Sequence, residues 1–217
     1  MERTNHLAEI LSVNRENFCS VDTVIRKYPG HLLGTNFEVP AQTFYMPGEA
    51  QRKLLFRIAN RLRAKQETVA VAESVTAGML QLAVGSTENA SEFFQGGMTL
   101  YNLGQKCIHL GVEPIEAQQQ NCVSLKVAAQ MAMGITHKFR SDWGLALTGY
   151  ATPVPESDNK LYACYAIVYR DTVKAKGKIR STHKDPQQVQ EQYVMAVLKK
   201  WWEEVRKSKS QKDRKKA

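Results

Sequence analysis

The chain has 217 residues, 43% of them hydrophobic and 24% charged, which is the composition of an ordinary globular protein. No stretch approaches the roughly 18 consecutive apolar residues that a transmembrane helix needs, and residues 1–18 lack the apolar core of a secretory signal. We therefore expect a cytoplasmic protein without membrane contacts. The formal net charge is +9, and residues 206–217 supply +6 of it through seven Lys or Arg and one Asp.

Residues 1–47 are predicted to form an irregular arm, because two short helical stretches at 4–11 and 20–28 are followed by repeated prolines and glycines from Pro29 onward. The arm carries no chemical motif. We expect it to pack on the following domain or on a protein partner.

From residue 49 the hydrophobic pattern becomes regular. Apolar residues at helical spacing predict a helix that begins at Glu49, and an apolar run at 67–73 predicts a buried strand. The further predicted elements are a helix at 74–85, a strand at 92–101, helices at 102–111, 115–120 and 123–139, a strand at 143–151, a strand pair at 160–182 and a closing helix at 185–207. Ser124 and Asp185 are good helix caps, with Pro186 at the first helical position.

The alternation of strands and helices predicts an α/β protein, a three-layer α/β/α sandwich with a mainly parallel central sheet and antiparallel additions near the C-terminus. The domain is predicted to span residues 48–205. Residues 206–217 are predicted to be a basic, disordered tail, since they contain no apolar side chain to bury before Ala217. The simplest interpretation is a solvated tail, and weak contact with nucleic acid is the alternative.

Four cysteines, Cys19, Cys107, Cys122 and Cys164, are widely spaced, and none forms a C-x-x-C pair. This pattern indicates neither a zinc site nor a disulfide framework. It favours a reduced, intracellular protein without a bound metal.

The segment from Glu73 to Gly78 lies where the first predicted strand leads into a helix. Free backbone N–H groups and the positive end of the helix dipole gather at such a point, which would stabilise a phosphate or a developing oxyanion. Ser74 would present its hydroxyl there as a nucleophile. The simpler alternative is that Ser74 is only a helix N-cap.

Tyr101 and Lys106 follow the second strand, and Thr148 and Gly149 end the third. A lysine desolvated beside a serine can act as a general base, because burial lowers its pKa. The alternatives are a tyrosine at a strand edge, a solvated helix lysine and an ordinary loop. Because ligands bind beyond the carboxyl ends of the strands in such sheets, we expect these strand ends to converge with Ser74.

Together these segments resemble the CinA C-terminal domain family of nicotinamide-nucleotide amidohydrolases. The string A-E-S-x-T-x-G at 72–78 is similar to the family signature A-E-S-x-T-G-G, and F-x-G-G-x-x-x-Y with a later lysine and L-G-V at 94–112 is similar to its second motif. Val123-Ser124, A-x-x-M-A-x-G at 128–134, Asp142 and L-x-L-T-G at 145–149 follow in the family's order. The resemblance covers about Glu49 to Trp202.

The resemblance implies a homo-oligomer that hydrolyses the carboxamide of nicotinamide mononucleotide to the nicotinic acid nucleotide and ammonia, without a cofactor. Ser74 would be the nucleophile, Lys106 would activate it, and Tyr101 would position it or relay a proton. The substrate-binding residues that the resemblance implies are Glu73, Thr76, Ala77, Gly78, Thr148 and Gly149, with backbone N–H groups of 76–78 holding the anionic part of the ligand or the oxyanion.

Three departures from the family pattern concern the ligand. Ala77 replaces a glycine, which adds a Cβ where a ligand would approach the backbone. The loop after Thr148 contains prolines at 153 and 155 in place of a glycine-rich stretch. The family motif G-D-R-x-x-V-R reads KDPQQVQ at 184–190, so two arginines suited to bind phosphate are absent.

Two functions therefore remain open. The chain is either an amidohydrolase whose substrate depends less on a phosphate, or a catalytically inactive paralogue that serves as a binding or assembly module. The additional arm and tail fit the second. An open cavity beside Ser74, next to the loop 152–159, would favour the enzyme, and a filled one the module. Nucleic-acid binding through the tail is a third function, which predicts an affinity that falls steeply with salt.

Overall fold

The computed structural model describes residues 47–208. Its main elements are α3 (Glu49–Lys65), β1 (Val69–Glu73), α4 (Met79–Gly85), β2 (Phe94–Thr99), α5 (Leu103–Leu110), α6 (Pro114–Gln119), α7 (Leu125–Phe139), β3 (Trp143–Gly149), β4 (Tyr162–Tyr169), β5 (Thr172–Arg180) and α8 (Pro186–Lys207). The two helices predicted in the arm, Cys19 and residues 209–217 lie outside the described residues.

The strands form one sheet in the order β2-β1-β3-β4-β5. β1 pairs in parallel with both β2 and β3, whereas β3 with β4 and β4 with β5 pair antiparallel. The prediction of a mainly parallel sheet is therefore only partly correct. The reason is that β4 and β5 are joined by a two-residue turn at Arg170 and Asp171, both at positive φ, and a turn this short connects only antiparallel strands.

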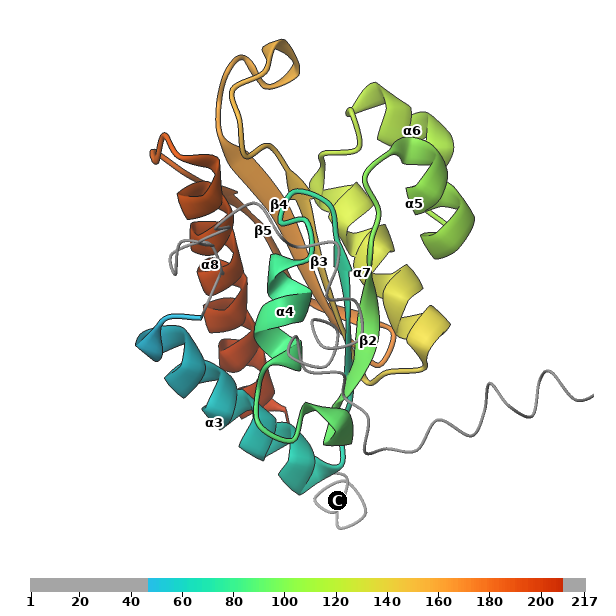
Figure 1. Ribbon diagram of the computed structural model, residues 1–217. Helices are drawn as coiled ribbons and strands as arrows, with labels where there is room; N and C mark the ends of the chain where they lie inside the picture. The colour runs from blue at the N-terminus through green and yellow to red at the C-terminus, as the bar shows by residue number, and fades with distance from the viewer. Residues whose placement is uncertain (1–46, 209–217) are drawn as a thin grey trace, which may run out of the picture. The chain divides into compact units, whose positions relative to one another are not determined.

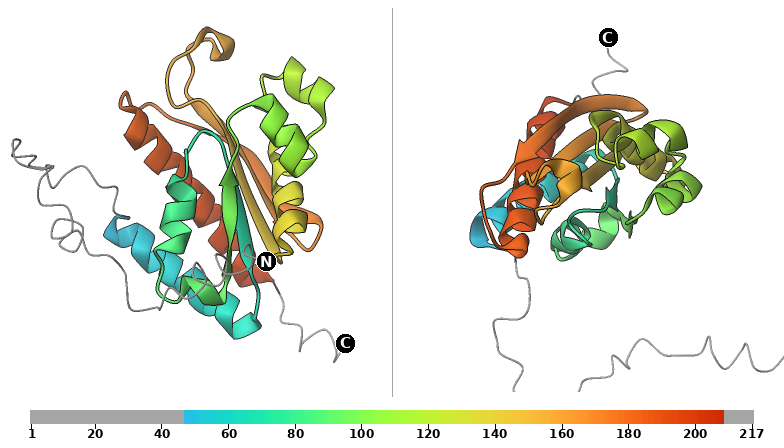
Figure 2. Two further views of the ribbon diagram at one scale, coloured as in Figure 1. Left: turned by 45° about the vertical axis from the view of Figure 1, so that its right-hand side comes forward. Right: turned by 90° about the horizontal axis from the view of Figure 1, so that it is seen from above.

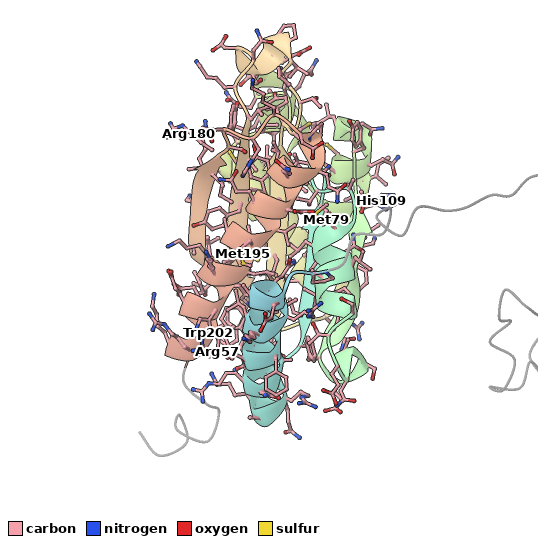
Figure 3. The ribbon with its side chains drawn as sticks, turned by 60° about the vertical axis from the view of Figure 1, so that its left-hand side comes forward. Arg57, Met79, His109, Arg180, Met195 and Trp202 are labelled. Carbon is pink, nitrogen blue, oxygen red and sulfur yellow. The ribbon has the colours of Figure 1, made fainter. Side chains whose placement is uncertain are left out.

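Helices cover both faces of the sheet, which confirms the three-layer prediction (Figures 1 and 2). One core lies between the sheet and α3, α4 and α8, and the other lies between the sheet and α5, α6 and α7. β1 and β3 are buried along almost their whole length, because both of their faces meet helices. The long helices of the first layer also contact each other, and the Arg57 guanidinium lies 4.6 Å from the centre of the Trp202 ring (Figure 3).

The predicted N-terminal caps of α7 and α8 are confirmed. The Ser124 side chain accepts a hydrogen bond from the Val127 N–H, and the Asp185 side chain accepts one from the Gln188 N–H. α8 runs to Lys207, where the predicted closing helix ends, so its last turn includes Arg206 and Lys207, the first two residues of the predicted basic tail. Within residues 47–208, no helix combines the length and the apolar character that crossing a bilayer requires.

The topology makes the carboxyl ends of β1 and β3 the candidate edge for a ligand site. β1 lies between β2 and β3, so the chain leaves β1 toward one side and returns to β3 on the other. Such a point, where the strand order reverses, leaves a crevice above the sheet that is not filled by a connection. The segments that follow β1, β2 and β3 all emerge at this edge, the upper one in Figure 1.

Candidate active site

A cavity of about 660 Å³ opens at this edge of the sheet, beside Ser74. Its floor includes Ser74 at the end of β1 and Thr148 at the end of β3. Thr152, Val154 and Glu156 contribute part of its wall, so the loop 152–159 borders the cavity and leaves it open. The remaining walls come from the start of α5, the segment 117–123 and the start of α8.

Lys106 lies in α5, the helix that follows β2, and its side chain extends to Ser74 at the end of the neighbouring strand β1. Its Nζ lies 3.1 Å from Ser74 Oγ, 2.8 Å from the Leu100 carbonyl oxygen and 3.1 Å from the Tyr101 carbonyl oxygen. The side chain is 1% exposed, and Ser74 is 8% exposed. Ser74 is itself held in place, because its backbone N–H donates to the Leu147 carbonyl of β3 at 3.0 Å.

The environment of Lys106 favours its neutral form. Burial lowers the pKa of Lys106 below its ordinary value of 10.5, because desolvation penalises the charged amine, and the nearby thiols of Cys122 and Cys107 oppose this only in part. A neutral amine has two N–H groups and one lone pair. The two carbonyl oxygens accept the two N–H groups, which leaves the lone pair to accept the hydrogen of the Ser74 hydroxyl.

The segment from Ser74 to Gly78 forms a turn, and this corrects the prediction that a helix opens directly at residue 74. Ala77 and Gly78 have φ of 50° and 101°, outside the helical region, and α4 begins only at Met79. Ser74 is therefore not the helix cap. Within the described residues, the backbone N–H groups of Val75, Thr76 and Gly78 have no hydrogen-bond partner.

Glu73 supplies the cap that Ser74 does not. Its carboxylate accepts hydrogen bonds from the Leu80 and Gln81 N–H groups at the start of α4, at 2.9 and 2.8 Å, and from the Thr76 hydroxyl. Glu73 is fully buried and Thr76 is 1% exposed, and neither they nor Gly78 line the cavity. The structure thus places these three predicted ligand residues beneath the site, where they support the turn that carries Ser74.

Ala77, Thr148 and Gly149 do line the cavity. The Thr148 hydroxyl donates its hydrogen to the Cys122 carbonyl at 2.8 Å, so it can meet a ligand only as an acceptor. At Gly149 an added Cβ would lie 2.4 Å from the Tyr162 carbonyl oxygen on β4. The close approach of β3 and β4 therefore requires glycine at this position.

Tyr101 meets the Ser74–Lys106 pair through its main chain. Its carbonyl oxygen accepts the hydrogen bond from Lys106, while its side chain is 81% exposed at the mouth of the cavity. The prediction that Tyr101 positions the nucleophile or relays a proton assumed a side-chain contact. In this structure the positioning contact belongs to the carbonyl groups of Leu100 and Tyr101.

The cavity also contains residues that the sequence did not single out as functional. Asn121 and Cys122 lie in a turn with positive φ between α6 and α7, and Tyr150 and Glu156 lie beyond β3. Burial raises the pKa of the Cys122 thiol, and the adjacent Lys106 partly offsets this rise. No periodicity marks these positions, because they become neighbours only when the loops fold over the strand ends. Among residues 47–208, no group of three His, Cys, Asp or Glu side chains is arranged to bind a metal ion.

Comparison with known proteins shows that this architecture recurs. The crystal structure of a competence or damage-inducible protein from Enterobacter asburiae aligns with a TM-score of 0.67 at 26% identity, over 71% of this chain and 98% of that one. A competence/damage inducible protein from Agrobacterium tumefaciens, at 22% identity, shares the fold with a TM-score of 0.70 over 76% of this chain and all of that one.

The curated relatives are longer proteins, and only part of each of them aligns with this chain. A CinA-like protein from a Picosynechococcus species is 40% identical over 114 residues, which are 52% of this chain and 27% of that protein. A CinA-like protein from Rippkaea orientalis is 37% identical over 134 residues, 62% of this chain and 32% of that protein. This chain thus spans less than a third of the length of these relatives. A family model described as the CinA C-terminal domain matches residues 51–205, and the chain belongs to the CinA C-terminal domain family.

Proposed function

We propose that this chain is an amidohydrolase of the nicotinamide-nucleotide amidohydrolase type, in which Ser74 attacks a carboxamide. The single observation that carries the proposal is the buried Lys106 Nζ, 3.1 Å from Ser74 Oγ, at the floor of an open cavity. A serine is a weak nucleophile alone and needs an adjacent base, and a desolvated lysine is one of the groups that serve.

The first step of the proposed reaction is acylation of Ser74, with Lys106 as the base. Neutral Lys106 takes the Ser74 proton while Oγ forms a bond to the carboxamide carbon, and the carbonyl electrons move to the oxygen. The backbone N–H group of Val75, which lines the cavity and has no hydrogen-bond partner among the described residues, is the donor at hand for this oxyanion. The intermediate then collapses, the C–N bond breaks, and protonated Lys106 gives its proton to the departing ammonia.

In the deacylation step, water takes the place of the serine hydroxyl and the same proton transfers occur again. Lys106, neutral again, takes a proton from a water molecule that attacks the acyl carbon. Collapse of the second intermediate returns the proton to Ser74 Oγ and releases the carboxylic acid. The loop 152–159 supports this use of the cavity, because it borders the space beside Ser74 without filling it.

Ammonia release from nicotinamide mononucleotide and from related carboxamides tests the proposal. The parent protein should release ammonia, and Ser74→Ala should release none beyond the uncatalysed background. Ser91→Ala, which changes an exposed serine remote from the cavity lining, is the matched control. A folded parent that releases ammonia from no carboxamide would contradict the proposal and favour the alternative of an inactive binding or assembly module.

A further inference from the structure

The charge of the cavity beside Ser74 indicates which amides it accepts. Two of the described lining residues carry a formal charge, Lys106 and Glu156. The other polar members of the wall are neutral, namely Ser74, Tyr101, Asn102, Gln118, Asn121, Cys122, Thr148, Tyr150, Thr152 and Gln190. A phosphate monoester carries up to two negative charges near neutral pH and is usually held by arginine or lysine.

Lys106 has no donor to offer such a phosphate. Its three polar contacts, with Ser74 Oγ and the carbonyl oxygens of Leu100 and Tyr101, use every hydrogen of an ammonium group. Burial also disfavours its charged form. Lys106, the one basic side chain among the described lining residues, is therefore engaged with the serine and the two carbonyl groups.

The N-termini of α5 and α8 at the cavity do not replace the missing cations. The start of α8 reaches the wall through Pro186, which has no N–H, and the Asp185 carboxylate already accepts a hydrogen bond from this helix end. The start of α5 is capped by the Asn102 side chain, which accepts from the Gln105 N–H. Glu156 carries negative charge in the wall, where a phosphate would need positive charge.

The neighbouring basic residues line a different cavity. Lys160, Lys178, Arg180 and Lys184 surround a hollow of about 670 Å³ on the other side of the loop 152–159. Glu156 lines both cavities and thus lies between them. Lys160 pairs with Asp158 at 3.2 Å, and the Lys178 ammonium lies 4.0 Å from the centre of the Tyr162 ring.

We propose that the cavity beside Ser74 selects amides that carry no phosphate group, neutral or cationic, and disfavours nucleotides. The neutral amide side chains of Asn121, Gln118 and Gln190 supply hydrogen bonds, and Glu156 attracts a positively charged ring. The inference rests on the proposed function for the reaction itself, but it concerns binding and can be measured without turnover.

Nicotinamide riboside and nicotinamide mononucleotide form a matched pair of probes, because they differ by one phosphate. Binding of each to Ser74→Ala, in the full chain, is measured by titration calorimetry. The riboside should bind about tenfold or more tightly than the mononucleotide, since a like charge near Glu156 costs affinity. Equal or tighter binding of the mononucleotide, or binding of neither probe, overturns the inference.

Two variants sharpen the test by changing the charge of the wall. Gln190→Arg adds a cation at the cavity and should improve mononucleotide binding by about tenfold relative to the riboside. Arg180→Gln, in the neighbouring hollow, should leave the ratio unchanged. A loss of mononucleotide binding in Arg180→Gln would mean that the phosphate reaches that hollow, which also overturns the inference.

Ammonia release by the parent protein keeps the two proposals separable. If the binding preference is present but neither probe is hydrolysed, the inference stands and the proposed function fails. If the mononucleotide is hydrolysed with the higher kcat/KM, the proposed function stands and the inference fails.

Discussion

Lys106 and Ser74 are 32 positions apart in the sequence, and the lysine Nζ lies 3.1 Å from the serine Oγ. Each is held by the main chain around it. Ser74 is tied to β3 through the Leu147 carbonyl, and the Lys106 amine lies against the carbonyls of Leu100 and Tyr101. A pair positioned in this way is already arranged for proton transfer before a substrate enters, which lowers the cost of reaching the transition state.

Replacing Lys106 by methionine should abolish most of the activity. Lys106→Met keeps a long unbranched side chain in the buried position and removes the base, so we expect kcat to fall by about 10²–10⁴. The variant should stay folded with a moderate change in melting temperature, because the carbonyl oxygens of Leu100 and Tyr101 lose their donor while the desolvation cost of a buried amine is removed. Lys126→Met on the surface of α7 is the control. Full activity in Lys106→Met would exclude lysine as the base.

The pH dependence follows from the lowered pKa of Lys106. The neutral amine is the active form, so activity should be lost as the pH falls through the pKa of Lys106 in the folded protein, which lies below 10.5. The rate profile of the parent measures this pKa. Activity that keeps its full value down to the pH at which the protein unfolds would contradict the assignment.

Stability should depend on the same titration, with a definite sign. Because burial lowers the pKa of Lys106, the unfolded chain binds more protons than the folded chain between the lowered pKa and 10.5. The contribution of Lys106 to the free energy of unfolding therefore rises with pH across this window. Urea unfolding of the parent and of Lys106→Met at several pH values isolates it, and equal slopes for the two proteins would contradict the prediction.

Glu73 should act on stability more than on substrate binding. Its two oxygens accept three hydrogen bonds at the start of α4, and in Glu73→Gln the amide NH₂ would face a donor. We expect a loss of about 1–3 kcal/mol in the free energy of unfolding. Urea titration measures the loss, with the exposed Glu88→Gln as control. An unchanged midpoint would show that Glu73 does not support the turn.

Ala77 carries backbone strain that glycine would relieve. Its φ of 50° lies in the left-handed region, which costs an L-residue about 1–2 kcal/mol relative to its usual conformations. Ala77→Gly should therefore stabilise the protein, whereas Ala129→Gly in the middle of α7 should destabilise it by about 1 kcal/mol. Thermal unfolding of both variants gives the comparison, and two shifts of the same direction would be inconsistent with strain at Ala77.

Variants of Tyr101 test whether its main-chain carbonyl or its side-chain hydroxyl contributes to activity. The carbonyl oxygen contacts Lys106 and the side chain is exposed, so Tyr101→Phe should retain kcat close to that of the parent. Replacement of Tyr101 by proline, which alters the main chain, should lower it. A large drop in kcat for Tyr101→Phe, with KM unchanged, would instead mean that the hydroxyl turns inward once a substrate is bound.

Most helices and strands of the fold, and part of the candidate site, could be predicted from the sequence alone. The apolar runs at 67–73 and 143–151 predicted buried strands, and the caps at Ser124 and Asp185 predicted the starts of two helices, because these signals are local. The strand ends made Ser74, Lys106 and Thr148 candidates beside simpler alternatives, and the resemblance to the family supplied the roles expected of them.

Tertiary structure decided how each of these residues is used. In the sequence Glu73 and Ser74 are simply neighbours. Only in the folded chain does the Glu73 carboxylate accept hydrogen bonds from the start of α4 while Ser74 faces the cavity. The fold likewise decided the exposure of the Tyr101 side chain, the antiparallel half of the sheet and the presence of Glu156 in the wall. These outcomes depend on contacts between residues far apart in the chain, and no local pattern of side chains encodes such contacts.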